Sequence, residues 1–339
     1  MTPGTSPDVP DDAADGLAPP TDPSPDEVWV SDDGRLFLTG GSHRVLDQIT
    51  GRMVPDPASV AAFAANTAAR AALCDRSGIG FSMWVFPEPL FVQRDTLPEL
   101  AARTGRLISP YLTHYAPAVA GLPVHYPLAT LEGRPACFRR VDSHYSARGF
   151  LRIAMQIMDD CHPGLGQAHM RAATDAIAAL PPEARLRARS GDLGRKFTPA
   201  RRERTSVVPP LITWSEVSNG VRGNMGILVL LDSPAGQRDE TLLVFGDSYL
   251  RSLLPSLAWG WRRILFCRSP FMHDELIAAV RPARIICGTA ERYLSAVRPD
   301  AARPHVLALP LIAGHQVIPD PGFGQAFARM VDQRAMTGA

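Results

Sequence analysis

Between residues 241 and 297 the sequence alternates three times between a short apolar run and a stretch with helical spacing. The apolar runs are TLLVF, RILFCRS and ARIICG, and the helical stretches begin at Ser248, at MHDELIAAV and at AERYLSAV. Short runs of this kind are typical of strands that are buried on both faces of a parallel sheet. Three consecutive strand–helix units therefore predict a parallel sheet covered by helices on both faces.

Upstream segments extend this pattern toward the N-terminus. An alanine-rich stretch from Pro57 to Arg76 begins with proline and is followed by Gly78, which predicts a helix with these bounds. GIGFSMWVFP then predicts a buried strand, and two further helices are expected, from Ala147 to Cys161 and over GQAHMRAATDAIAAL. Residues 28–41 predict a β-hairpin with its turn at Asp33-Gly34. We expect an α/β fold, a three-layer α/β/α sandwich with a mainly parallel sheet.

The N-terminal stretch differs from the rest in composition. Residues 1–27 are rich in Pro, Asp, Ser and Gly, and they lack both a basic start and an apolar segment. This predicts a disordered tail and not a signal peptide, with a single domain over residues 28–339. No window approaches the roughly 18 consecutive apolar residues of a membrane span. We expect a cytoplasmic location and no membrane span.

Charge and cysteine usage exclude several classes of function. Lys and Arg number 35 against 34 Asp and Glu, so no overall field favours nucleic acid. Lys196 is the only lysine, which disfavours Schiff-base chemistry. The five cysteines include no C-x-x-C pair, so we expect buried free thiols, and the histidines lack metal-ligand spacing. No glycine-rich phosphate loop is present, and we expect neither a metal nor a cofactor.

The first strand–helix unit turns at Gly246-Asp247-Ser248. Functional groups of open parallel sheets collect outside the carboxyl ends of the strands. Gly246 would permit a sharp turn, and Ser248 then falls at a helix N-terminus, where backbone N–H groups and the helix dipole favour developing negative charge. Asp and Ser are also preferred helix caps, so a purely structural role for this corner stays open.

A second polar constellation lies upstream, in RRVDSHYSARGF. Asp142 and His144 are two residues apart, so an extended backbone would place both side chains on one face. A serine hydroxyl becomes a good nucleophile when a neutral imidazole takes its proton, and a carboxylate fixes the imidazole tautomer. This segment contains both an imidazole and a carboxylate. The alternative is a surface turn before a helix that Ser146 caps.

These two motifs resemble those of a known family. GDSY looks like the nucleophile block of SGNH hydrolases, and DSHYSARG resembles the Asp-Thr-His-Trp…Gly block of the SGNH-hydrolase-like domain of alginate O-acetyltransferases, in which Asp-x-His also precedes the serine. VWVSDDGRLFLTGG, WVFPEPLFVQRDTLP and RPARIICGTAERYL are weaker similarities in the same order, so the resemblance runs from Val28 to Leu294. Arg35 and Tyr145 replace the family's tryptophans, and PEP stands where many members have a lysine after the proline.

The resemblance implies roles for individual residues. Ser248 would be the nucleophile, His144 the general base and acid, and Asp142 the group that orients His144. The backbone N–H of Ser248 is the expected first donor to the oxyanion. A second oxyanion or substrate donor stays open among three candidates, Asn224, Arg292 and Tyr293.

The expected reaction is transfer of an acetyl or other small acyl group to a carbohydrate hydroxyl through an acyl-serine. The expected partners are an acyl donor and a carbohydrate acceptor, and the resemblance adds a membrane-bound acyltransferase. An esterase and a catalytically silent glycan-binding assembly protein are the alternatives. Relatives that modify exopolysaccharide act outside the cytoplasm, which conflicts with the location expected above.

One basic segment has no place in these motifs. Residues 185–204 hold eight basic side chains. They predict a solvated loop or, alternatively, a surface for an anionic glycan or a phosphorylated carrier, because arginine matches carboxylate and phosphate geometry.

Overall fold

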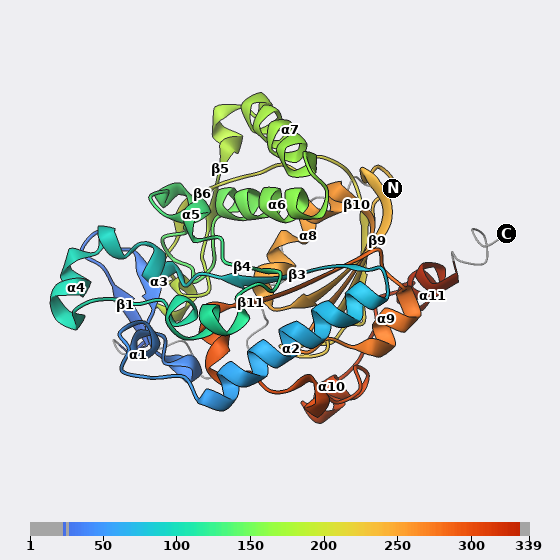
Figure 1. Cartoon of the computed structure of the whole chain (residues 1–339). Coiled ribbons are helices and arrows are strands. Elements are labelled where there is room, and N and C mark those ends of the chain that lie inside the picture. The colour runs from blue at the N-terminus through green and yellow to red at the C-terminus, as the bar shows by residue number, and fades with distance from the viewer. Residues whose placement is uncertain (1–22, 25–26, 333–339) are drawn as a thin grey trace.

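A seven-stranded sheet forms the centre of the computed structural model, which describes residues 23–24 and 27–332 (Figure 1). Its strands, in spatial order, are β4 (Val124–His125), β3 (Gly80–Phe86), β11 (Arg284–Ala290), β9 (Arg238–Gly246), β10 (Trp261–Arg268), β8 (Leu228–Asp232) and β7 (Ser215–Ser218). The pairs from β4 to β10 are parallel, whereas β8 is antiparallel to both of its neighbours. The sheet is therefore mainly parallel, as predicted.

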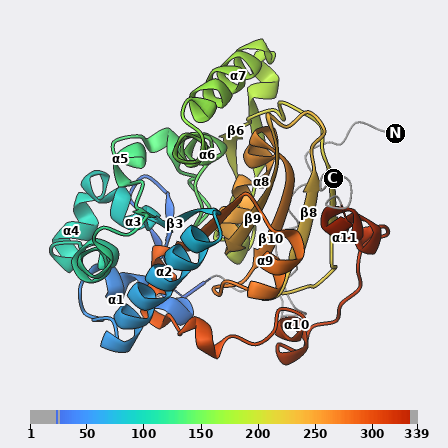
Figure 2. The same cartoon turned by 45° about the vertical axis from the view of Figure 1, so that its right-hand side comes forward.

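Helices cover both faces of this sheet (Figures 1 and 2). One face packs against α6 (Ala147–Cys161) and α8 (Ser248–Gly260), with α7 (Leu165–Ala179) lying on the outer side of α6 (Figure 1). The other face packs against α2 (Pro57–Arg76), α9 (Asp274–Val280) and α11 (Phe323–Asp332). Along β9, Leu242 and Val244 join the first core cluster, and Leu243 and Phe245 join the second. This alternation of buried side chains produces the three α/β/α layers, which confirms the predicted fold class.

Short elements surround the sheet. The predicted hairpin forms from β1 (Val28–Val30) and β2 (Leu36–Leu38), which pair antiparallel, and Gly34 takes a φ of 80° in its turn. The short helices are α1 (Val45–Ile49), α3 (Pro89–Val92), α4 (Pro98–Thr104), α5 (Leu128–Leu131) and α10 (Ala308–Ile312). The expected tail, residues 1–27, lies outside the described residues except for residues 23, 24 and 27.

Two long helices have the predicted bounds because their local signals are strong. Pro57 occupies the first turn of α2, and the side chain of Asp56 accepts a hydrogen bond from the N–H of Ala58. Ser146 caps α6 in the same way, through the N–H of Gly149. The five cysteines are free and buried, as expected. Within the described ranges, no helix combines the length and apolarity that crossing a membrane requires.

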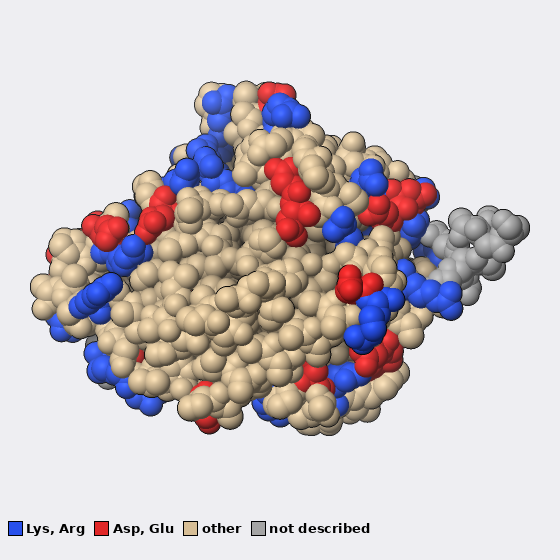
Figure 3. All heavy atoms as spheres, viewed as in Figure 1, with Lys and Arg blue, Asp and Glu red and all other residues tan. Residues whose placement is uncertain are grey.

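Two predictions of local structure need correction. The helix expected over AERYLSAV is a 3-10 helix, Glu291–Ala296. The basic segment 185–204 is not simply a solvated loop, because β5 (Leu186–Arg189) pairs antiparallel with β6 (Glu203–Ser206). Basic side chains gather around these strands in the upper part of Figure 3. A short ribbon with exposed, charged strands lacks the apolar alternation by which strands are found in a sequence.

Candidate active site

The serine corner is built by the junction of β9 and α8. Strand β9 ends at Gly246 and Ser248 is the first residue of α8. Asp247 is the helix cap: one carboxylate oxygen accepts the N–H of Tyr249 at 2.9 Å, and the other accepts the N–H of Ala290 at 2.6 Å. Because Asp247 supplies the cap, the half-buried hydroxyl of Ser248 is left for another role.

Glycine is required at this corner for a different reason from the expected one. Gly246 lacks a left-handed φ, so the turn itself does not demand glycine. A Cβ there would instead lie 2.5 Å from the carbonyl oxygen of Gly288 and 2.6 Å from Cδ1 of Leu250. Gly246 and Gly288 are paired in register across β9 and β11. The two glycines therefore let the first turn of α8 pack directly on the sheet.

The structure brings Asp142, His144 and Ser248 together. The Nε2 atom of His144 lies 2.8 Å from Oγ of Ser248, and its Nδ1 atom lies 2.9 Å from Oδ1 of Asp142. The second carboxylate oxygen of Asp142 accepts a hydrogen bond from Nη1 of Arg139 at 2.6 Å. The imidazole thus bridges a hydroxyl and a buried carboxylate, an arrangement that can activate a serine.

Charges around the imidazole favour its protonated form. Burial opposes ionisation of Asp142, but the hydrogen bond and charge of His144, together with Arg139, hold the pKa of its carboxyl well below the usual range. Burial likewise disfavours charged His144, yet Asp142 and then Asp192 raise the pKa of the imidazole. A proton taken from Ser248 would therefore be stabilised on His144.

Ser143, between the Asp and the His, is held from two sides. Its carbonyl accepts hydrogen bonds from the hydroxyl of Tyr249 at 2.7 Å and from Nη2 of Arg292 at 3.2 Å. Its N–H and its hydroxyl donate to the carboxylate of Asp192, at 2.7 and 2.5 Å. These contacts fix the backbone from which both neighbouring side chains project.

The three candidates for a second oxyanion donor lie in different surroundings. Arg292 is buried, contacts Tyr249 and Ser143, and pairs with Glu88 at 2.9 Å, which favours a positioning role. Tyr293 is half-buried, with its ring edge-on to His43. Asn224 has an exposed side chain.

Asn224 lies in a loop beside the serine corner. Its neighbour Gly226 donates to the carbonyl of Arg268, and Arg268 is paired with Gly246 across β10 and β9. The side chain of Asn219 holds this loop by bonding the carbonyl of Gly226 and the N–H of Leu228. Asn224 has the most exposed side chain of the three candidates, whereas the charges of Asp247 and Arg268 act on the half-buried Tyr293.

Sequence reasoning missed two buried acids that lie behind the Asp-x-His turn. Burial raises the pKa of Glu88 to about 7, although the Arg292 charge opposes this rise. Glu291 accepts hydrogen bonds from the N–H of Glu88 at 3.0 Å and from the hydroxyl of Ser109 at 2.5 Å. The proline-flanked PEP, where the resembled family differs, was the one available signal for Glu88.

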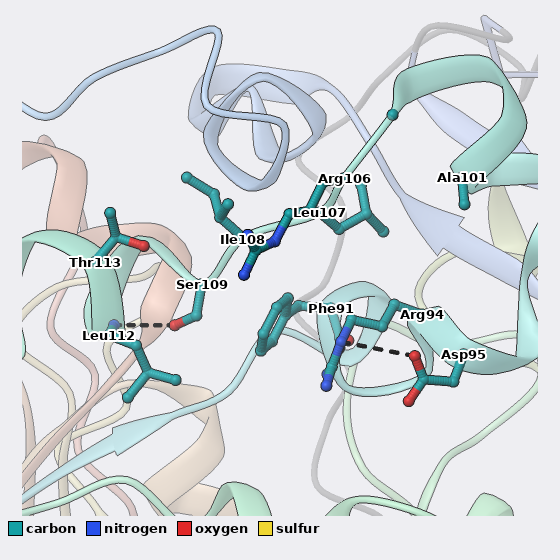
Figure 4. A pocket seen from close by; sticks show the side chains of 11 residues that line it. Phe91, Arg94, Asp95, Ala101, Arg106, Leu107, Ile108, Ser109, Leu112 and Thr113 are labelled. Carbon is teal, nitrogen blue, oxygen red and sulfur yellow. Dashed lines mark hydrogen bonds and ion pairs between the residues drawn. The ribbon is translucent and has the colours of Figure 1, made fainter.

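A surface pocket of about 410 Å³ lies beyond these acids (Figure 4). Arg94 and Asp95 are on one side of it, and Ile108 and Thr113 are on the other. Ser109 lines the pocket and donates to Glu291, so it connects the pocket wall to the buried carboxylates.

One set of side chains has the composition of a metal site. Single ligand atoms of Asp142, His144 and Asp192 lie within 4.8 Å of one another. These atoms are already engaged with Ser248, Ser143 and Arg139, and with each other. We therefore interpret the set as a hydrogen-bonded cluster and assign no metal to it.

The chain is similar to several solved structures at low sequence identity. No family model and no curated protein matches it. Among solved structures, it is similar to Bacillus cereus PatB1 with a sulfonyl adduct, with 11% identity, TM-score 0.49, and 78% of this chain and 94% of the other covered. A DHHW family protein from Eubacterium siraeum gives 11% identity, TM-score 0.49, and 78% and 90% coverage. The O-acetyltransferase domain of Pseudomonas putida AlgJ gives 12% identity, TM-score 0.40, and 91% and 99% coverage. Similarities this distant carry no argument about the reaction.

Proposed function

We propose that this protein is a serine-dependent O-acyltransferase that moves an acetyl or other small acyl group to a carbohydrate hydroxyl. The observation that carries the proposal is the hydrogen-bonded series Asp142–His144–Ser248 at the carboxyl edge of a parallel sheet. The carbohydrate acceptor rests on the resemblance of GDSY and DSHYSARG to the acetyltransferase branch of the SGNH family. We further propose that the acyl donor comes from a membrane-bound acyltransferase.

The first half-reaction loads the serine. As Oγ of Ser248 attacks the acyl carbon, its proton moves to Nε2 of His144, while Nδ1–H of His144 donates to Asp142. The oxyanion that forms accepts hydrogen bonds from the backbone N–H of Ser248 and from the side chain of Asn224. His144 then returns the proton to the departing donor group, which leaves acyl-Ser248.

The second half-reaction repeats these roles with the acceptor. His144 takes the proton of a sugar hydroxyl as its oxygen attacks the acyl carbon of acyl-Ser248. Collapse of the oxyanion breaks the bond to Oγ, and His144 gives the proton back to Ser248. The acylated sugar leaves and the starting state of the enzyme is restored.

An esterase is the second candidate. Ser248 is half-buried and the side chain of His144 is 23% exposed, so water can reach the same imidazole. Water as acceptor would use identical groups and differ only in the second half-reaction.

A fluorophosphonate probe tests the proposal directly. Peptide mass analysis should locate the adduct on Ser248, and Ser248→Ala and His144→Ala should abolish it. Ser252→Ala is a matched control, because Ser252 lies one turn further along α8 and its hydroxyl bonds the carbonyl of Ser248. Folded protein that stays unlabelled, or that is labelled elsewhere, would favour a silent glycan-binding protein.

A simple acetyl ester then separates transfer from hydrolysis. Release of the leaving group should accelerate when oligosaccharides are added, and mass analysis should find acetylated sugar. Turnover that is unaffected by any sugar would assign the protein to the esterases.

A further inference from the structure

Asp192, in the turn between β5 and β6, lies in the candidate active site. Oδ1 of Asp192 accepts the N–H groups of Ser143 at 2.7 Å and Leu193 at 2.8 Å. Oδ2 accepts the hydroxyl of Ser143 at 2.5 Å and lies 3.8 Å from Nδ1 of His144. Asp192 thus reaches the same edge of the imidazole as Asp142.

The backbone of this turn fits closely against the Asp142 segment. A Cβ on Gly191 would lie 2.2 Å from the carbonyl oxygen of Val141 and 2.5 Å from Cβ of Asp142. The same carbonyl accepts the N–H of Gly194 at 2.9 Å. Leu193 is buried in one small apolar cluster with Val141. Main-chain contact and packing therefore determine where Asp192 lies.

We propose that Asp192 is a positioning residue for His144, which it holds through Ser143 and whose charged form its carboxylate stabilises. This rests on the proposed function of Ser248 and His144. The imidazolium that forms in both half-reactions then faces two carboxylates. Asp142 accepts the hydrogen bond from Nδ1–H of His144. Asp192 holds Ser143, the residue between Asp142 and His144.

Other charges also act on this imidazole. Arg292 and Glu88 lie beneath the turn, and Asp247 lies beside Ser248. Arg139 pairs with the far oxygen of Asp142. Loss of the Asp192 charge leaves Arg292 less opposed, so the pKa of His144 should fall in its absence.

Two substitutions separate charge from geometry. Asp192→Asn removes the charge but keeps an oxygen for the N–H of Ser143, whereas Asp192→Ala removes both. We expect the pH midpoint of fluorophosphonate labelling to move lower in Asp192→Asn. Labelling should slow on the order of 10²-fold in Asp192→Ala, because the base is displaced. Asp239→Asn is the matched control, since Asp239 lies near the opposite end of β9 from Ser248.

Histidine NMR measures the same property without any reaction. The titration of ¹³C-labelled His144, assigned with His144→Ala, should shift to lower pH in Asp192→Asn and stay unchanged in Asp239→Asn. An unchanged titration with normal labelling would overturn the role of Asp192 and leave the proposed function standing. Wild-type protein that is never labelled would overturn the proposed function, while the titration still decides the effect of Asp192 on His144.

Ser143→Ala is the control for an effect of local geometry on the pH midpoint. It removes one hydrogen bond to Asp192 and keeps the carboxylate. We expect a wild-type pH midpoint with slower labelling. A midpoint that moves as far as in Asp192→Asn would assign the shift to geometry and overturn the role of the charge.

Discussion

The serine corner and the Asp-x-His turn reach the same site by different means. Strand β9 is paired in parallel on both sides, so main-chain hydrogen bonds determine where Ser248 lies. The Asp142–His144 turn lies outside the sheet and depends on side chains of distant residues, namely Asp192, Tyr249 and Arg292. The proposed nucleophile is therefore placed by regular structure and the proposed base by a few polar contacts. Substitutions around the base should disturb function more readily.

The largest expected effect comes from variants that remove one side chain from each of these two regions. Ser248→Ala and His144→Ala should each remove most acetyl-ester turnover, on the order of 10⁶-fold in the best-studied serine enzyme. The double variant should be little worse than either single one, because the two groups act as a unit. Losses that multiply in the double variant would mean that the corner and the turn act independently.

Asp142→Asn tests the turn alone. The amide favours the wrong imidazole tautomer, so kcat should fall on the order of 10⁴-fold. The melting temperature should fall as well, because Arg139 and His144 stabilise the ionised Asp142 carboxylate in the folded state, so kcat is compared on folded protein. A kcat near that of wild type would remove Asp142 from the mechanism.

Arg292→Met tests the buried support of the turn. It leaves the Glu88 carboxylate without its partner, and loss of one member of a buried pair costs about 3–5 kcal/mol of unfolding free energy. In the wild type the folded pKa of Glu88 is raised to about 7, so stability is lost as pH rises from its ordinary value of 4.5 to about 7. Without the Arg292 charge this pKa rises further, so the variant continues to lose stability at higher pH. Denaturant unfolding should therefore show a greater loss at pH 8 than at pH 6.

A Glu88→Gln, Arg292→Met double variant is the control for this prediction. It removes the unpaired charge, so it should recover part of the stability and lose the extra pH dependence. Equal losses at both pH values in the single variant would show that Glu88 is not the responsible group.

Asn224→Ala tests the serine corner. Removal of one oxyanion donor costs about 10²–10³-fold in kcat, and the exposed position predicts an unchanged melting temperature. Tyr293→Phe is the comparison variant, because it removes the hydroxyl of the half-buried candidate. A larger loss in Tyr293→Phe than in Asn224→Ala would transfer the donor role to Tyr293.

Much of the fold was predictable because its signals are local. The bounds of α2 follow from a capping acid, a proline and a following glycine, and the strands on either side of Ser248 follow from their apolar runs. The antiparallel strand β8 and the β5–β6 ribbon were not predicted. Strand direction and pairing depend on distant partners, and a charged ribbon has no apolar period.

The sequence by itself determined the long helices and the buried parallel strands, and it predicted Ser248, His144 and Asp142 as a chemical set by residue type, spacing and resemblance. Only the tertiary structure placed Ser248 beside His144, which lies 104 residues away in the sequence. It also showed that Asp192 contacts the Asp-x-His turn, and that Arg292, an oxyanion candidate in the sequence, is buried beneath this turn. The physical reason lies in the range of each interaction. Hydrophobic period and helix capping act within a few residues, whereas the path of an irregular segment depends on contacts that form only when the whole chain has packed.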